Sequence, residues 1–309
     1  MALIFHSNVA SPAPWIAALQ ALMPDLEIRV WPEIGDPADA EVMLAWLPPR
    51  GSLARLPNLK LLQCMGAGVD QLLADESIPP GLPVARLVND NQTAGMTEYV
   101  LAAVLRYHRR LDEYARFQRD RHWERLPHVD ACDRCIGVMG LGDLGRAVAD
   151  KLALLGFPLV GWSRHPKELA GIDTFHGPDG LQLFLPRCEI LVCLLPFTPS
   201  TADILCRDLF DRLPRGAHLI NAGRGPLLVE EDLLRALDDG RIAGATLDVF
   251  RREPLPVDDL LWAHPKLTIT PHIATIVTPQ STAPQIVENI RRVRAGLPPR
   301  HLIDRSVGY

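Results

Sequence analysis

The sequence predicts an α/β protein built from two doubly wound domains with parallel sheets. Short apolar runs of strand length alternate along the chain with stretches of helical character, which is typical of such sheets. A glycine-rich segment directly follows one of these runs, where a strand must turn sharply into a helix. The chain has 309 residues, enough for two domains of about 150 residues each.

The first ninety residues predict one sheet. The expected strands are 2–5, 28–31, 42–46, 60–64 and 84–88. The intervals between them are polar or helical, which favours parallel strands joined by helices.

One long amphipathic helix is predicted between Gly95 and Gln118, as a bridge between the domains. Its apolar residues are spaced four and three apart, as one face of a helix requires: Val100, Val104, Tyr107, Leu111 and Tyr114.

A second α/β series starts after the loop around Pro127. The expected strands lie near 136–140, 158–162, 189–194, 217–221, 243–249 and 267–270. A last helix, from about 281 to 295, should stop at Gly296-Leu-Pro-Pro, which is a helix terminator.

Composition and charge exclude several classes of function. Hydrophobic residues form 48% and charged residues 22% of the chain, which excludes disorder as its main state. The 32 Lys and Arg against 37 Asp and Glu give a net charge of −5, so no global positive field attracts nucleic acid or an anionic membrane. No run of about 18 apolar residues occurs, and the start MALIFHSN lacks a basic segment before an apolar core. We expect a cytoplasmic protein with a small-molecule partner.

A CxxC pair at Cys132 and Cys135 is the one motif with metal or redox potential. A zinc site would need a second ligand pair at suitable spacing, and a redox site a thioredoxin-like context. The sequence offers neither, so we expect no metal and assign the pair no role.

Three glycines predict a dinucleotide site after the strand at 136–140. In Gly140-Leu-Gly142-Asp-Leu-Gly145 the first permits a tight turn, the second the approach of a pyrophosphate, and the third close packing of helix on strand. The N-terminus of the next helix adds oriented N–H groups and a partial positive charge for the phosphates.

The end of the next strand predicts which dinucleotide binds. A carboxylate there would bind the 2′-hydroxyl of NADH and repel a 2′-phosphate, but this chain has Ser163 and Arg164, with Lys167 close by. A hydroxyl and a guanidinium suit a phosphate through charge-assisted hydrogen bonds. We therefore expect NADPH, with NADH less favoured.

Three polar residues lie at the ends of later strands, where open α/β sheets bind ligands. Arg224, between glycines in NAGRG, could hold a carboxylate through two hydrogen bonds. A histidine held by a carboxylate stays protonated near neutral pH, as carbonyl reduction requires, and Glu253 and His272 could form such a pair.

With these residues in place, the chain resembles the D-isomer-specific 2-hydroxyacid dehydrogenase family, in its branch that reduces glyoxylate and hydroxypyruvate. The matching strings are GLGDLG, NAGRGPLLVEEDLLRAL, GATLDVFRREPLP and TPHIAT. WSR, MGAGVDQLL, LLPFTPST, AWLPPR and the C-terminal IDRSVGY extend the resemblance to nearly the whole chain.

The resemblance implies roles for individual residues. Arg224 would bind the substrate carboxylate and polarise the keto oxygen, His272 would be the general acid, and Glu253 would pair with His272. The N–H groups of Ala67 and Gly68 would receive the carboxylate from the other domain, and Trp46 would wall the pocket. The cofactor contacts expected from the motifs and the resemblance together are Gly140, Leu141, Gly142, Asp143, Leu144, Gly145, Ser163, Arg164, Lys167, Leu195, Pro196, Ala222, Gly223, Arg224, Asp248 and His272, with Asp248 on the nicotinamide carboxamide.

The resemblance also implies a domain plan. A Rossmann-type NADP-binding domain, residues 95–283, would be inserted in a flavodoxin-like substrate-binding domain, residues 1–94 and 284–309, which closes on it about a hinge. The bridging helix would lie in a homodimer interface.

Two alternatives remain open from the sequence. One keeps the enzyme class but changes the substrate to a bulkier 2-oxo acid such as phenylpyruvate. The other is a non-enzymatic protein that senses NAD(P) on the same fold.

Overall fold

The computed structural model describes residues 2–305, the side chains at 70 and 71 excepted. The last four residues of the IDRSVGY string therefore lie outside the described residues. Two compact units are present: the first runs to Gln92 and resumes at Ile276, and the second is Thr93–Thr275. The chain returns to the first unit between residues 275 and 276, eight residues before the predicted boundary between 283 and 284. The reason is that the whole of the last helix packs within the first unit.

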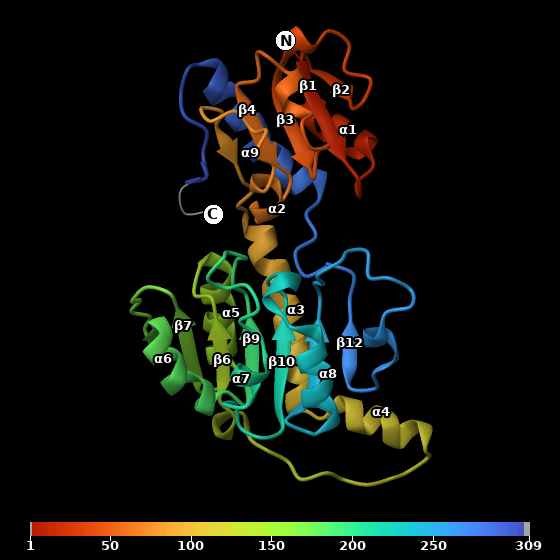
Figure 1. Ribbon diagram of the computed structural model, residues 1–309, viewed down its shortest axis with the longest axis vertical. Coiled ribbons are helices and arrows are strands. Elements are labelled where there is room, and N and C mark those ends of the chain that lie inside the picture. The colour runs from red at the N-terminus through yellow and green to blue at the C-terminus, as the bar shows by residue number, and fades with distance from the viewer. Residues whose placement is uncertain (1, 306–309) are drawn as a thin grey trace. The chain divides into compact units, whose positions relative to one another are not determined.

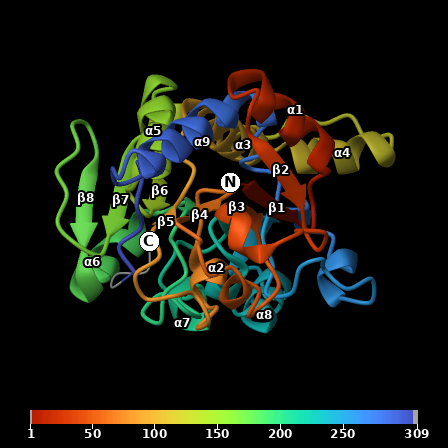
Figure 2. The same ribbon diagram turned by 90° about the horizontal axis from the view of Figure 1, so that it is seen from above.

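The first unit is a parallel sheet covered on both faces. Its described strands follow the order β2-β1-β3-β4-β5, the order of flavodoxin-like sheets. They are β1 (Ala2–Ser7), β2 (Glu27–Val30), β3 (Ala40–Trp46), β4 (Leu61–Cys64) and β5 (Val84–Ala85). The helices are α1 (Pro12–Leu22), α2 (Asp70–Leu73) and α9 (Pro279–Arg294), of which α1 and α9 lie side by side (Figure 2).

Alternation along β1 explains why this sheet has two apolar faces. Leu3 and Phe5 pack with Leu19 of α1 and Ile286 of α9, whereas Ile4 belongs to the cluster on the opposite face. Successive side chains of a strand point to opposite faces, so an unbroken apolar run builds both cores.

The second unit is a larger parallel sheet in the order β12-β11-β10-β9-β6-β7-β8. Counted from β6, this is the strand order of dinucleotide-binding sheets with one further strand added. The strands are β6 (Ile136–Met139), β7 (Leu159–Ser163), β8 (Asp173–His176), β9 (Ile190–Cys193), β10 (Ala217–Asn221), β11 (Ile242–Leu247) and β12 (Leu267–Ile269). The helices are α3 (Asp90–His108), which begins just before the unit boundary, α4 (Leu111–Arg119), α5 (Asp143–Leu154), α6 (Gly177–Phe184), α7 (Arg207–Phe210) and α8 (Glu230–Asp238).

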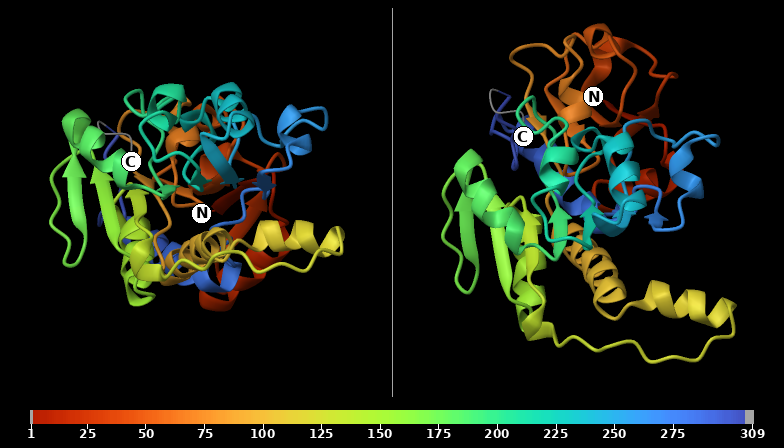
Figure 3. Two further views of the ribbon diagram at one scale, coloured as in Figure 1. Left: turned by 90° about the horizontal axis from the view of Figure 1, so that it is seen from below. Right: turned by 60° about the horizontal axis from the view of Figure 1, so that its bottom comes forward.

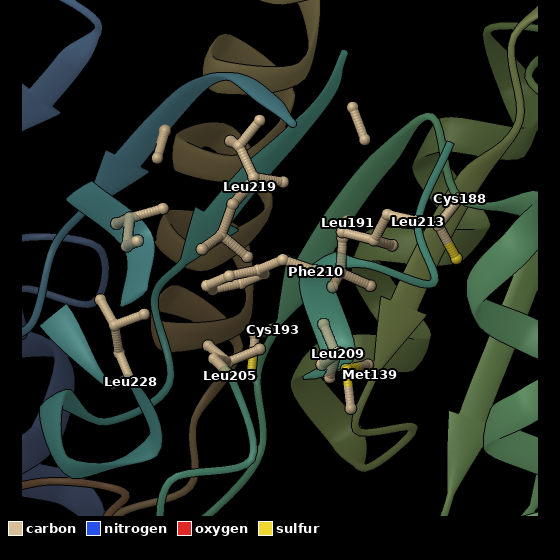
Figure 4. Close-up of a cluster of buried hydrophobic side chains, with 14 of the residues drawn as sticks. Met139, Cys188, Leu191, Cys193, Leu205, Leu209, Phe210, Leu213, Leu219 and Leu228 are labelled. Carbon is tan, nitrogen blue, oxygen red and sulfur yellow. The ribbon is translucent and has the colours of Figure 1, made fainter. Parts of the chain in front are cut away.

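Two apolar clusters also sandwich this sheet. One contains Met139, Leu191, Phe210 and Leu219 (Figure 4), and the other includes Val138 from the opposite face of β6. The predicted fold class, two doubly wound parallel sheets of these two types, is confirmed. Strand β8 was not predicted because it is polar and partly exposed, so it lacks the apolar run by which the other strands were recognised.

The single helix predicted between Gly95 and Gln118 is wrong, because the chain forms two helices there. Arg110 adopts a left-handed conformation, with φ 55°, between α3 and α4. Helix α3 packs on the sheet, but α4 has no buried residue and projects away from it (Figures 1 and 3). The helical spacing of apolar residues continues past His108 to Leu111 and Tyr114, but the contacts of α3 with the sheet end near His108. The spacing alone therefore predicted one helix that was too long.

In the part of the chain from 2 to 305, no helix is both long and apolar enough to span a bilayer.

Candidate active site

The glycine loop connects β6 to α5, and two of its glycines are required by close contacts. Gly140 has φ +100°, and a Cβ atom there would lie 2.8 Å from the carbonyl oxygen of Leu194. A Cβ at Gly145 would overlap the carbonyl oxygen of Gly140, so the helix can approach the strand only without a side chain.

Gly142 differs from the other two glycines because the space beside it is open. Apart from Gly142 itself and its neighbours along the chain, no atom of the described residues comes within 4 Å of the position that its Cβ would take. Gly142 is also the N-cap of α5 and carries no capping side chain, so the helix presents its first N–H groups at this point. An open approach to a helix N-terminus fits the pyrophosphate of a dinucleotide.

The loop after β9 lies next to the glycine loop and to the loop after β10. The Leu194 carbonyl approaches Gly140, and a Cβ at Gly223 would lie 2.8 Å from the carbonyl oxygen of Leu195. The carbonyl of Pro196 accepts a hydrogen bond from the Thr201 hydroxyl at 2.8 Å. Strands β6 and β9 are neighbours at the point where the strand order reverses, which is where open α/β sheets bind ligands.

The end of β7 carries the residues predicted to select the cofactor. The buried Ser163 hydroxyl donates to the carbonyl of His165 at 2.8 Å, and Arg164 and Lys167 are exposed. Lys167 Nζ donates to the carbonyl of Leu141 at 2.5 Å, which ties this segment to the glycine loop. A hydroxyl, a guanidinium and an ammonium group beside the glycine loop fit a 2′-phosphate.

Glu253 and His272 are in direct contact. His272 Nδ1 lies 2.8 Å from Glu253 Oε2, while Glu253 Oε1 accepts from the N–H of Phe250 at 2.9 Å. Burial alone would raise the pKa of Glu253, but hydrogen bonds from His272 and Phe250 and the charges of His272 and Arg224 outweigh it and lower that pKa. Glu253 is therefore ionised at neutral pH and faces the imidazole as a carboxylate.

Arg224 follows β10 in a loop shaped by a buried asparagine. Asn221, with no exposed surface, accepts from the N–H of Gly223 and donates to the carbonyl of Arg224, both at 3.2 Å. The residue after Arg224 must be glycine, because a Cβ at Gly225 would overlap the Phe250 backbone. Arg224 Nη1 donates to the Gly223 carbonyl at 2.7 Å. The role of Asn221 was not predicted from the sequence, although an asparagine before a glycine turn is a known turn signal.

Asp248 follows β11 and is 1% exposed. Its carboxylate accepts hydrogen bonds from the segment that carries His272, at residues 270, 273 and 274, and its carbonyl accepts from the N–H of His272. Arg224, Asp248 and His272 thus follow three adjacent parallel strands at the same edge of the sheet.

The predicted substrate residues of the first unit also lie together at strand ends. Trp46 ends β3, and its ring packs so closely over Gly66 that a Cβ there would overlap it. Ala67 and Gly68 follow in the loop after β4, where the carbonyl of Gly66 accepts from the N–H of Leu87 at 3.0 Å.

Cys132 is exposed and Cys135 is half-buried, and burial raises the pKa of the Cys135 thiol. Among the residues that the structure describes, no three His, Cys, Asp or Glu side chains gather in a way that could hold a metal ion.

Comparison with known proteins identifies the class to which this fold and site belong. The model for the NAD-binding domain of D-isomer specific 2-hydroxyacid dehydrogenases matches residues 101–274. The chain belongs to this family, as the sequence predicted.

Individual relatives narrow the class further. Proteins named glyoxylate/hydroxypyruvate reductase A, from Serratia proteamaculans and Yersinia enterocolitica, are each 42% identical to this chain over 314 residues. Each alignment covers 100% of this chain and 100% of the relative. A D-isomer specific 2-hydroxyacid dehydrogenase from Xanthobacter autotrophicus Py2, solved with NADPH and MES, is 45% identical with a TM-score of 0.95, covering 100% of this chain and 99% of that one. An NADPH-dependent glyoxylate/hydroxypyruvate reductase from Sinorhizobium meliloti, solved with NADP and sulfate, is 34% identical with a TM-score of 0.94 and full coverage of both chains.

Proposed function

We propose that this protein is an NADPH-dependent reductase that converts a small 2-oxo acid, glyoxylate or hydroxypyruvate, into the 2-hydroxy acid, of (R) configuration where the product is chiral. The observation that carries the proposal is the 2.8 Å contact between His272 Nδ1 and Glu253 Oε2, at the sheet edge that also bears Arg224 and the glycine loop. The full-length relatives named glyoxylate/hydroxypyruvate reductase A support this substrate class.

His272 acts as the general acid in this proposal. Reduction of a keto group places negative charge on its oxygen, and a protonated imidazole can neutralise it as the hydride arrives. Glu253 occupies Nδ1, so Nε2 is the atom that gives up the proton. The ionised Glu253 stabilises the protonated ring before the transfer and fixes its orientation.

Arg224 binds the substrate carboxylate and polarises the keto oxygen. A guanidinium offers two parallel N–H groups, which match the geometry of a carboxylate and of the neighbouring keto oxygen. In the first unit, the backbone N–H groups of Ala67 and Gly68 bind carboxylate oxygens of the substrate, and Trp46 provides an aromatic wall. In this assignment the second unit binds the cofactor and carries Arg224 and the general acid, and the first unit contributes backbone N–H groups and an aromatic side chain.

The cofactor is NADPH, which when bound supplies the hydride from its nicotinamide C4. Ser163, Arg164 and Lys167 hold the 2′-phosphate, while residues 140–145 and the N-terminus of α5 hold the pyrophosphate. Leu195 and Pro196 line the adenosine side, Ala222 and Gly223 form the adjoining wall, and Asp248 contacts the carboxamide. Relatives solved with NADPH or NADP support this choice.

The protein acts as a homodimer in the cytoplasm. The region of α4 exposes apolar side chains, with Leu111 52% and Trp123 95% exposed, and a second copy of the chain would cover them. The six cysteines are free thiols, which suits a reducing compartment.

Absorbance at 340 nm tests the function directly. NADPH and, separately, NADH are mixed with glyoxylate, hydroxypyruvate, pyruvate or phenylpyruvate at matched concentrations. We expect rapid oxidation of NADPH with the first two acids. A preference for NADH would refute the role of Arg164, and a preference for phenylpyruvate would assign the protein to bulkier substrates.

The variant His272→Gln tests the general acid. We expect kcat to fall by about 1,000-fold while the Kd of NADPH, measured by fluorescence, is unchanged. His264→Gln is the matched control, because His264 lies in the same unit but contacts Asp238 outside the site. Full activity in His272→Gln would overturn the mechanism, and NADPH binding without turnover in the unmodified protein would favour a sensor.

A further inference from the structure

The general acid lies on a segment whose backbone is sterically disfavoured. His272 has φ 55°, a left-handed conformation that costs energy for any residue with a Cβ. Such a conformation persists only where surrounding contacts fix it. The contacts that fix His272 therefore determine where its ring lies.

Asp248 provides the immediate contacts. The N–H groups of the three successive residues 272–274 all donate to Asp248: His272 to its carbonyl oxygen, Ile273 to Oδ1 and Ala274 to Oδ2, each at 2.8 Å. One buried residue thus binds the backbone N–H groups of all three residues 272–274.

A chain of two hydroxyl groups extends this network to α3. Thr270 Oγ1 donates to Asp248 Oδ1 at 2.6 Å, and Tyr99 OH lies 2.6 Å from Thr270 Oγ1. A hydroxyl group has one proton, and that of Thr270 is used on the carboxylate. Tyr99 must therefore donate to Thr270, so both bonds point toward Asp248.

The phenol of Tyr99 is a permanent donor. Burial raises the pKa of Tyr99 to about 12, so the phenol keeps its proton through the pH range in which enzymes work.

Helix α3 contacts the same segment at a second point, one turn earlier. A Cβ at Gly95 would lie 3.3 Å from the carbonyl oxygen of Ala274. Gly95 and Tyr99 are four residues apart and share one face of α3, so this face supports both ends of the segment 270–274.

We propose that Tyr99 and Thr270 are positioning residues for the general acid: they hold the segment 270–274 through Asp248 so that the His272 ring stays against Glu253. This inference rests on the proposed function of His272. Neither residue touches the substrate, and both act through the position of the ring.

The chain contains a matched control for this proposal. Tyr107, two turns further along α3, pairs with Thr246 Oγ1 of β11 at the same 2.6 Å, and the strand partner of Thr246 is Thr268, which lies before the segment 270–274. Tyr107→Phe therefore removes the same kind of hydrogen bond from the same helix without loosening His272.

The experiment compares Tyr99→Phe with Tyr107→Phe in kcat, KM, the Kd of NADPH and amide hydrogen exchange of the peptide 271–276. We expect Tyr99→Phe to lower kcat about tenfold, with Kd unchanged and faster exchange in this peptide. Tyr107→Phe should change neither kcat nor this exchange. Thr270→Val should lower kcat more than Tyr99→Phe does, and Thr270→Ser, which keeps the hydroxyl, should restore it.

Equal kcat values in Tyr99→Phe and the unmodified protein, or equal losses in the two tyrosine variants, would overturn the proposal. The proposed function fails separately. If His272→Gln stays active while Tyr99→Phe still accelerates exchange in this peptide, the segment is positioned by Tyr99 but His272 is not the acid. Because exchange does not depend on turnover, the two failures are distinguishable.

Discussion

The two units use the same kind of parallel sheet but present different groups at the carboxyl ends of their strands. In the second unit these ends carry Arg224 and His272, with Asn221 and Asp248 buried beneath them. In the first unit they carry Trp46 and a loop with two glycines, which offer an aromatic surface and backbone N–H groups. Under the proposed function, charge and proton transfer belong to the second unit, and shape recognition to the first.

The largest effect is expected for Arg224→Gln. If this guanidinium binds the substrate carboxylate, its loss should lower kcat/KM by about 1,000-fold while NADPH still binds. Steady-state kinetics with hydroxypyruvate measures this change. Arg235→Gln, at a side chain that is 66% exposed, is the control and should leave the rate unchanged. If Arg224→Gln kept full activity, Arg224 would not bind the substrate carboxylate, and the proposed role of charge in the second unit would be contradicted.

Glu253→Gln should lower kcat by about 100-fold. Glu253 has a lowered pKa and is a carboxylate at neutral pH, so the amide removes a negative charge that stabilises the protonated His272 ring. Steady-state kinetics with hydroxypyruvate measures this change. Glu231→Gln, whose side chain is 82% exposed, is the control. An unchanged kcat would show that the charge of Glu253 takes no part in the reaction.

The second unit should lose stability as pH falls. His218 is enclosed against the ring of Tyr107 at a centroid distance of 4.3 Å, and burial, with the charge of Arg134, lowers its pKa to about 4. A histidine with a lowered pKa in the folded state favours unfolding once the unfolded chain takes up protons, near pH 6.5. The stability is therefore complete above this pH and is lost progressively down to pH 4.

Urea unfolding at pH 7.5 and pH 5 measures this effect. The free energy of unfolding should fall by about 2 kcal/mol between them, a factor of about 30 in the equilibrium constant. His218→Phe keeps the ring against Tyr107 and should flatten this dependence. An equal slope in His218→Phe would assign the acid sensitivity to other groups.

The smallest effect is expected in the first unit. Trp46→Phe should raise the KM for glyoxylate about tenfold with kcat and the Kd of NADPH unchanged, because a smaller ring closes the pocket less tightly. Trp31→Phe is the control, since Trp31 stacks under Arg55 at the end of another strand of the same sheet. A loss of kcat rather than a rise in KM would contradict the division of labour between the units.

Strands and the glycine loop could be predicted because their signals are local. Each core strand carries an apolar run, and Gly140, Gly142 and Gly145 stand within six residues, where a strand passes into the first turn of a helix. The edge strand β8 could not be predicted, because it is polar and has no apolar run. The break at Arg110 could not be predicted either, because no local pattern shows where the surface that a helix packs on ends.

The sequence by itself determined the fold class, the family, the glycine loop and the residue types at the strand ends. Only the tertiary structure decided which of these groups meet. Glu253 and His272 are 19 residues apart, and Tyr99 and Thr270 are 171 apart. Motifs arise from short-range backbone requirements, whereas a hydrogen bond between distant residues depends on how helices and strands pack, which no local pattern encodes.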